Sequence, residues 1–169
     1  MPPVLSSYLR RRWNRIRKNF RSLWKHYLYQ TCLATLVLAV VLWLLSAENA
    51  VIVASIGATA FLVFSMPRIA TAQPRRIIGG QLIGLLAGSL LALVPHPAAV
   101  LAAVIYSLAV GLSMFLMIAL DLAHPPAAGT ALGVAISGFS LPVMLAVITS
   151  SLALAAAHRY LYREFRNLI

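Results

Sequence analysis

The feature that most limits the fold is a nearly continuous apolar stretch from residue 28 to residue 158. The whole chain has 169 residues, of which 62% are hydrophobic and only 10% are charged. Soluble domains are about 45–50% apolar and about 25% charged, so this composition is typical of an integral membrane protein. One crossing of the hydrocarbon core needs roughly 20 apolar residues in a helix. The stretch therefore predicts an all-α, polytopic helical membrane protein with four to six crossings.

The basic residues indicate which ends of the crossings lie on the same side of the membrane. The 14 Lys and Arg residues fall into three groups, at residues 10–25, 68–76 and 159–166. The positive-inside rule places all three groups in the cytoplasm, so an even number of crossings must separate them. The predicted crossings are 28–46, 50–66, 77–94, 98–120, 126–139 and 142–158. We expect both termini in the cytoplasm and the protein in a bacterial inner membrane.

The fifth of these crossings is short for a full passage through the bilayer. Two interpretations remain open for residues 125–141. One is a half-helix that is continued by extended backbone, and the other is a re-entrant loop.

The N-terminal 27 residues alternate apolar and basic side chains at helical spacing. This pattern predicts an amphipathic helix that lies in the membrane interface and contacts anionic lipid. The formal net charge of +11 then follows from the positive-inside rule, and we do not expect nucleic acid as a partner. The predicted organisation is a basic interfacial helix at 1–27, a transmembrane domain at 28–158 and a basic cytoplasmic tail at 159–169.

One helix break lies within the apolar stretch, at residues 121–126. Proline has no backbone N–H and pushes the preceding residue out of the α region, so a helix arriving from residue 120 should end near His124. Proline is well tolerated in the first turn of a helix, so a new helix should begin at Pro125 or Pro126. The break places an imidazole and the carboxylate of Asp121 beside a helix N-terminus. At membrane depth it is the first candidate for a functional site.

A row of glycines marks one face of the third predicted crossing. Gly80, Gly84 and Gly88 are four residues apart, a spacing that lets another helix backbone approach closely. The row either packs helices within one protomer or forms the interface of a homo-oligomer.

Two segments of the chain resemble one another, at residues 56–67 and 128–142. Each runs from Gly, Thr and Ala through an apolar stretch to Phe-Ser-Met-Pro or Phe-Ser-Leu-Pro. Each would be the middle helix of a three-helix unit, at 28–94 and 98–158. An odd number of helices per unit makes the two units opposite in orientation. We therefore predict two inverted repeats with interrupted middle helices, between which a substrate would bind.

Two motifs in order make the chain similar to the HPP family of integral membrane proteins. The N-terminal motif comprises Gly57-Ala58-Thr59-Ala60, Pro67, Ala72-Gln73-Pro74-Arg75 and Gly79-Gly80. The C-terminal motif is His124-Pro125-Pro126. The resemblance covers roughly residues 45–158 and implies a small helical membrane domain. Some plant-plastid and cyanobacterial members are associated with nitrite transport. This chain departs from the family pattern at Gln81, where histidine is frequent, and at Asp121, where an uncharged or basic residue is common.

The resemblance implies a membrane transporter or channel for a small anion, with nitrite as the leading candidate. The alternative is a membrane scaffold or sensor subunit without transport activity. The chain offers few candidate metal ligands and no nucleophile–base pair, so we expect neither an enzyme nor a cofactor. The expected substrate-binding residues are Ser55, Gly57, Thr59, Asp121, His124, Pro125, Pro126, Gly129 and Thr130.

The chemistry of an anion site explains this choice of residues. Free backbone N–H groups at a helix N-terminus bind anions, small residues keep those groups accessible, and hydroxyl side chains add donors. His124 can supply a proton or a switchable positive charge near neutral pH. Asp121 would either pair with His124 or cap the new helix. The structural alternative is that His124 satisfies backbone groups at the break and that Asp121 lies in cytoplasmic water.

Overall fold

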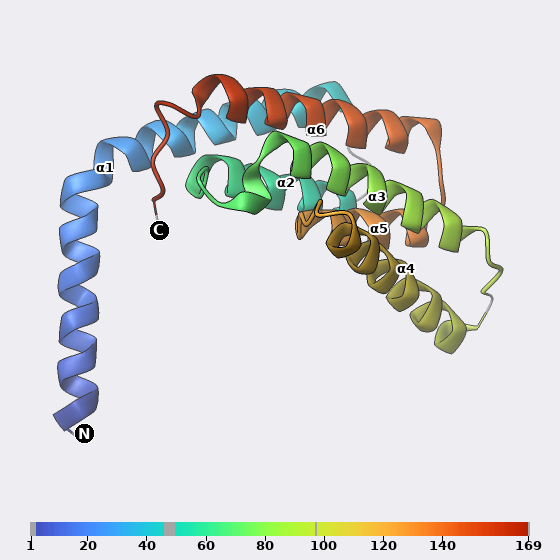
Figure 1. The fold of residues 1–169 in the computed structure, drawn as a ribbon, viewed down its shortest axis with the longest axis horizontal. Helices are drawn as coiled ribbons and strands as arrows, with labels where there is room; N and C mark the ends of the chain where they lie inside the picture. The colour runs from blue at the N-terminus through green and yellow to red at the C-terminus, as the bar shows by residue number, and fades with distance from the viewer. Residues whose placement is uncertain (1–2, 46–49, 97, 169) are drawn as a thin grey trace.

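The described part of the chain is folded into six α-helices and one short 3-10 turn (Figure 1). The computed structural model describes residues 3–45, 50–96 and 98–168, and within them every regular element is helical. The elements are α1 (Pro3–Leu45), α2 (Ala50–Ser65), η1 (Ala70–Ala72), α3 (Pro74–Ala92), α4 (Ala99–Ala119), α5 (Pro126–Ser137) and α6 (Leu141–Leu161). The predicted all-α class is confirmed, and each predicted crossing corresponds to one helix.

The helices differ in their ability to cross a bilayer. Within the described residues, α4 and α6 are both apolar enough and long enough, with 21 residues each. α2 has 16 residues and α5 has 12. At 1.5 Å per residue α5 is about 18 Å long, whereas the hydrocarbon core is about 30 Å thick. α5 alone is therefore too short to cross, as expected for an interrupted helix.

The N-terminal segment is not a separate helix. The sequence predicts a boundary between residues 27 and 28, but α1 continues without interruption from Pro3 to Leu45. Figure 1 shows that α1 bends, so that its N-terminal part leaves the bundle and its C-terminal part lies along the other helices. Helical propensity is continuous across the junction, because neither proline nor glycine occurs between residues 4 and 45.

The second and third basic groups lie at one end of the bundle, and the part of α1 that carries the first group leaves the bundle from the same end. The backbone N–H of Arg68 donates to Oδ1 of Asn167 at 3.1 Å, which joins the loop after α2 to the C-terminal segment. The hydroxyl of Tyr27 donates to the carbonyl of Leu168 at 3.1 Å, which brings the bend of α1 to the same place. This shared end is the arrangement that an even number of crossings between the groups requires.

The C-terminal segment packs against the helices and is not a free tail. After α6, residues 162–168 turn back across α1 and α2. Phe165 is fully buried and packs against Phe64, with ring centroids 5.4 Å apart. The side chain of Gln30 is also fully buried and donates to the carbonyl of Arg166 at 3.0 Å. This segment therefore closes the basic end of the bundle.

α3 is packed among α4, α5 and α6, and its glycine row makes the closest contacts. A Cβ atom on Gly80 would lie 2.6 Å from Cβ of His124, and one on Gly88 would lie 2.5 Å from the carbonyl oxygen of Ala131. A Cβ on Gly84 would overlap the carbonyl oxygen of Ala127. Of the two interpretations of this row, packing within the protomer is confirmed.

The predicted middle helices of the two three-helix units, α2 and α5, pack directly against each other. α2 is continuous from Ala50 to Ser65 with 16 residues and α5 has 12, so both are shorter than a full crossing and α5 is the shorter of the two. The inverted relation between the units stays a prediction. The polar side chains of the candidate site, described below, lie at the contact between α2 and α5.

Candidate functional site

The helix break between α4 and α5 places His124 inside the bundle. α4 ends at Ala119, and Asp121 adopts a positive φ of 52° that reverses the chain. Pro125 and Pro126 then begin α5, as the sequence predicts. His124 lies between the turn and the new helix, and it has no exposed surface. The break therefore carries a buried imidazole rather than a solvent-facing one.

Both ring nitrogens of His124 have partners. Nδ1 lies 2.8 Å from the carbonyl oxygen of Thr71 in η1, and Nε2 lies 3.0 Å from the hydroxyl of Thr59 in α2. A carbonyl can only accept a hydrogen bond, so Nδ1 carries a hydrogen. The bond to Thr71 confirms the predicted role of His124 in satisfying backbone groups. The bond to Thr59 goes further, because it joins the imidazole to a set of polar side chains.

This set, called the polar cluster below, consists of five buried side chains from α2, α3, α5 and the break. Its members are Ser55, Thr59, Gln81, His124 and Thr130. Nε2 of Gln81 donates to Oγ1 of Thr59 at 3.1 Å, and Oε1 of Gln81 accepts from Thr130 at 2.6 Å. The hydroxyls of Ser55 and Thr130 are 2.8 Å apart. Among the described residues, no buried side-chain nitrogen or oxygen lacks a hydrogen-bond partner.

The polar cluster lies where small residues let the helices approach. A Cβ on Gly129 would lie only 3.4 Å from Cβ of Ser55, so this glycine sets the spacing between α5 and α2. The hydroxyl of Ser55 donates to the carbonyl of Pro126 at 2.6 Å, across the same contact. Ser55, Thr59, His124, Pro126, Gly129 and Thr130 were all predicted for the site, and the structure brings them together. Pro125 begins the same helix but its side chain is exposed.

Asp121 lies outside the polar cluster, which corrects the prediction of a pair with His124. Its side chain has a relative exposure of 69% and forms ion pairs with Arg75, at 3.2 Å, and with Arg76. It does not cap α5 either, because no side chain accepts a hydrogen bond from the N–H groups at that helix start. Its carboxylate is better solvated and compensated at the basic end than it would be beside a buried ring. The alternative that Asp121 lies in water is confirmed.

The start of α5 offers no free N–H group, which corrects a second prediction. Pro125 and Pro126 have no N–H. The N–H of Ala127 donates to the carbonyl of His124 at 2.9 Å, and that of Ala128 donates to the carbonyl of Pro125 at 3.1 Å. The backbone N–H groups that were predicted to bind an anion are therefore already hydrogen-bonded within the first turn of α5. Donors at this site come from side chains.

Gly57 is also outside the polar cluster. No atom lies within 4 Å of a Cβ built on it, so it faces away from α5. It lines a groove between α1 and α2 together with Gln30 and Phe61. The structure therefore does not bring Gly57 together with the other predicted site residues, because residues 57 and 55 are two positions apart and lie on different faces of one helix.

Gln81 is the member of the polar cluster that the sequence prediction omitted. It is 3% exposed and touches three other members, so it connects α3 to α2 and α5. One signal was available: an amide side chain in the interior of an apolar crossing needs polar partners. Its position directly after Gly80 also places it next to the helix face that makes the closest contacts.

The fold and the polar cluster define an integral membrane protein built from helices around a small buried polar centre. The chain belongs to the HPP transmembrane family. The model of that family, described as "HPP, transmembrane region", matches residues 17–165, which is most of the chain. The resemblance inferred from the two sequence motifs is thereby confirmed.

One relative is similar over part of the chain. It is "Transmembrane protein DDB_G0269096" of Dictyostelium discoideum, which is 34% identical over 88 residues. The match covers 52% of this chain and 31% of the relative, so the chain spans less than a third of that protein. No solved structure matches.

Proposed function

We propose that this protein is a transporter or channel for a small anion, that it is not an enzyme, and that the polar cluster is its binding site. Nitrite is the leading candidate. The observation that carries the proposal is the convergence of five polar side chains at one buried point of the bundle. Each of these groups is costly to place away from water, and polar side chains inside membrane domains commonly line substrate pathways.

The chemistry of the cluster suits a small hydrogen-bond acceptor. Hydroxyls, an amide and an imidazole supply donors, and no carboxylate among the described residues belongs to the cluster. An anion would enter by replacing bonds that the cluster now makes with itself. The bonds of Thr130 to Ser55 and to Gln81 join α5 to α2 and α3, so binding would loosen the short helix from its neighbours.

The orientation follows from charge. The basic end of the bundle would face the cytoplasm, together with both termini. The scaffold or sensor function remains the alternative, and a protein that moves no solute would support it.

The test is nitrite flux into proteoliposomes with the Thr130→Val protein. Valine keeps the shape of threonine and removes its hydroxyl, so the bond to Gln81 and the contact with Ser55 are both lost. A hydrogen bond to a charged group contributes about 1.5–3 kcal/mol, so we expect flux to fall about tenfold or more. Thr149→Val is the matched control, because Thr149 is exposed and its hydroxyl bonds to the carbonyl of Leu145 in its own helix at 2.6 Å.

A thermal melt in detergent shows whether each variant is folded. If the Thr130→Val protein is folded and has the flux of the wild type, the polar cluster is not part of the transport pathway. Wild-type protein with no more flux than empty vesicles would overturn the transport proposal for nitrite.

A further inference from the structure

The hydroxyl of Thr59 has one hydrogen and two acceptors within reach. It lies 3.0 Å from the carbonyl oxygen of Ser55, one turn back in α2, and 3.0 Å from Nε2 of His124. Gln81 is not a third acceptor for this hydrogen, because its Nε2 donates to the hydroxyl oxygen of Thr59. Rotation about one C–O bond decides which acceptor receives it.

The two positions of this hydrogen correspond to two charge states of His124. When Thr59 donates to Nε2, the ring carries a hydrogen on Nδ1 alone and is neutral. When Thr59 donates to Ser55, Nε2 is able to donate to Thr59, and the ring carries two hydrogens and a positive charge. Nδ1 is bonded to Thr71 in both states. The ring therefore gains or loses a proton without moving any non-hydrogen atom.

The surroundings of His124 supply no charge to balance the second proton. Among the described residues, α2, η1 and α5 contain no titratable side chain. α3 contributes Arg75 and Arg76, which are at its outer end and bonded to Asp121. α4 contributes only Tyr106, which packs on His96 at the far end of the bundle. The charged ring would be a buried cation without a counterion, which is unfavourable.

We infer from this geometry that the protein binds a proton and its anion together, with His124 Nε2 as the proton site. The inference rests on the proposed function. A bound anion supplies the missing negative charge, and the protonated ring supplies a donor that the neutral ring lacks. Because linkage is reciprocal, each of the two ligands then raises the affinity for the other. A proton taken from water on one side travels with the anion and is released with it on the other side, so no net charge moves.

The experiment records nitrite flux and internal pH together in proteoliposomes. We expect nitrite entry to acidify the interior by one proton per anion and to be insensitive to an imposed membrane potential. Flux should rise as the external pH is lowered from about 8 to about 5, across the range in which histidine titrates. Protein-free vesicles measure the passive entry of nitrous acid, which is subtracted.

The variant His124→Gln keeps a neutral donor and acceptor but cannot hold the proton. We expect its flux to fall about tenfold or more and its remaining flux to lose the pH dependence. His96→Gln is the matched control, since His96 lies in the exposed turn before α4. Nitrite flux without proton entry, or flux driven by the membrane potential, would overturn the coupling and leave the transport proposal standing. No flux at any pH would overturn the transport proposal itself.

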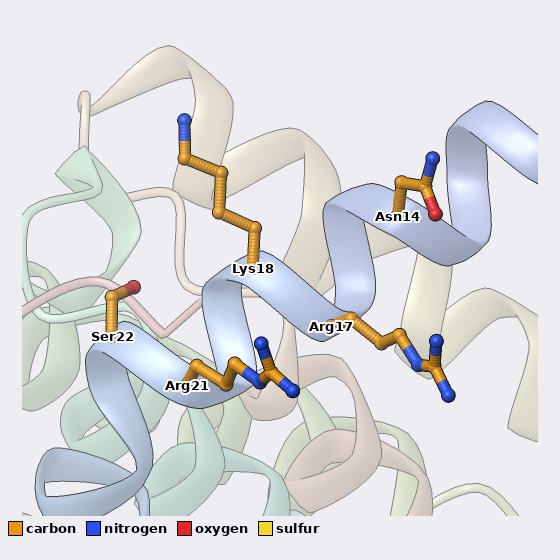
Figure 2. A pocket seen from close by; sticks show the side chains of 5 residues that line it. All are labelled: Asn14, Arg17, Lys18, Arg21 and Ser22. Carbon is orange, nitrogen blue, oxygen red and sulfur yellow. The ribbon is translucent and has the colours of Figure 1, made fainter.

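A second inference concerns the N-terminal arm, defined as residues 10–25 of α1. Its apolar face is uncovered: Trp13, Ile16, Phe20 and Trp24 have relative exposures of 58%, 49%, 61% and 45%. They recur at helical spacing and form one stripe. Figure 2 shows a polar face of the same segment, from which the side chains of Asn14, Arg17, Lys18, Arg21 and Ser22 project. The arm is thus an amphipathic helix that no other part of the described chain covers.

The place of the arm in the fold favours a bilayer as its partner. It leaves the bundle at the end where the hydroxyl of Tyr27 bonds to the C-terminal segment, and it runs across the direction of the bundle helices (Figure 1). Eight of its residues are Lys or Arg and none is acidic. We propose that the arm lies on a membrane surface rich in anionic lipid, with its aromatic stripe in the interface and its cations at the headgroups.

The test measures quenching of Trp13 by an aqueous quencher in the full chain, with Trp24→Phe and Trp43→Phe removing the other tryptophans. We expect Trp13 to be protected in vesicles that contain anionic lipid and to be more accessible in zwitterionic vesicles. Combined Arg17→Glu, Lys18→Glu and Arg21→Glu should reverse that protection. Combined Arg159→Glu, Arg163→Glu and Arg166→Glu, at the same end of the bundle, is the charge-matched control. Equal quenching in both lipids, or protection only after soluble protein is added, would overturn the proposal.

Discussion

Gly84→Leu should destabilise the bundle severely. The α carbon of Gly84 faces the backbone of α5, and even a Cβ atom there would overlap the carbonyl oxygen of Ala127. A carbonyl in a helix cannot rotate aside as a flexible side chain can, so α3 and α5 would have to separate. Overpacking of a core lowers the free energy of unfolding by about 1–3 kcal/mol and occasionally more. Because the clash here is with backbone, we expect a loss at or above the upper end of that range. The expected result is a large fall in the midpoint of the thermal melt in detergent, or no folded protein.

Gly111→Leu provides the comparison for this result. Gly111 lies in α4, and nothing lies within 4 Å of a Cβ built on it. The two variants make the same chemical change in two membrane helices, so they have the same direct effect on helix propensity. We expect Gly111→Leu to melt close to the wild type. A Gly84→Leu protein that is as stable as Gly111→Leu would show that α3 and α5 are not in this close contact.

The sequence predicted the helices well because apolar length and proline position are local properties. The break at Pro125 and Pro126 was placed correctly, since the geometry of proline depends only on its neighbours. The glycine row was recognised, but its partner was not. A four-residue spacing predicts that a helix backbone approaches but does not identify that helix, so packing within a protomer and packing between protomers were both candidates. The contacts with His124, Ala127 and Ala131 decide between them.

Two errors in the site, the partner of Asp121 and the omission of Gln81, arose because side-chain partners that are far apart in the chain were sought close together in the sequence. Asp121 is three residues from His124, yet it pairs with Arg75 and Arg76, some 45 residues away. The free N–H groups expected at the start of α5 are used by its own first turn. Gln81 was passed over because its partners are contributed by α2 and α5. Long-range pairing of this kind requires the packing of helices to be known.

The effect of charge at Gln81 gives the sharpest prediction for the site. Gln81→Glu keeps nearly the same shape, and a carboxylate can still accept from Thr130, whereas the bonds that the amide donates to Thr59 and Ser55 are lost. The side chain would place a fixed negative charge within the polar cluster. It would compensate a protonated His124 without any anion, and it would repel an anion that tried to enter. The protein should therefore fold, while nitrite flux should fall about tenfold or more.

The matched control is Gln73→Glu, which adds the same charge at the exposed residue that precedes α3. We expect its flux to equal that of the wild type, because the added carboxylate is solvated and near arginines. Proteoliposome flux and a thermal melt of both variants provide the comparison. Folded Gln81→Glu protein with full flux would mean that no anion occupies the cluster, because a small anion and a buried carboxylate cannot share a site without a second proton. Loss of flux in Gln73→Glu as well would assign the effect to the surface charge at the basic end instead.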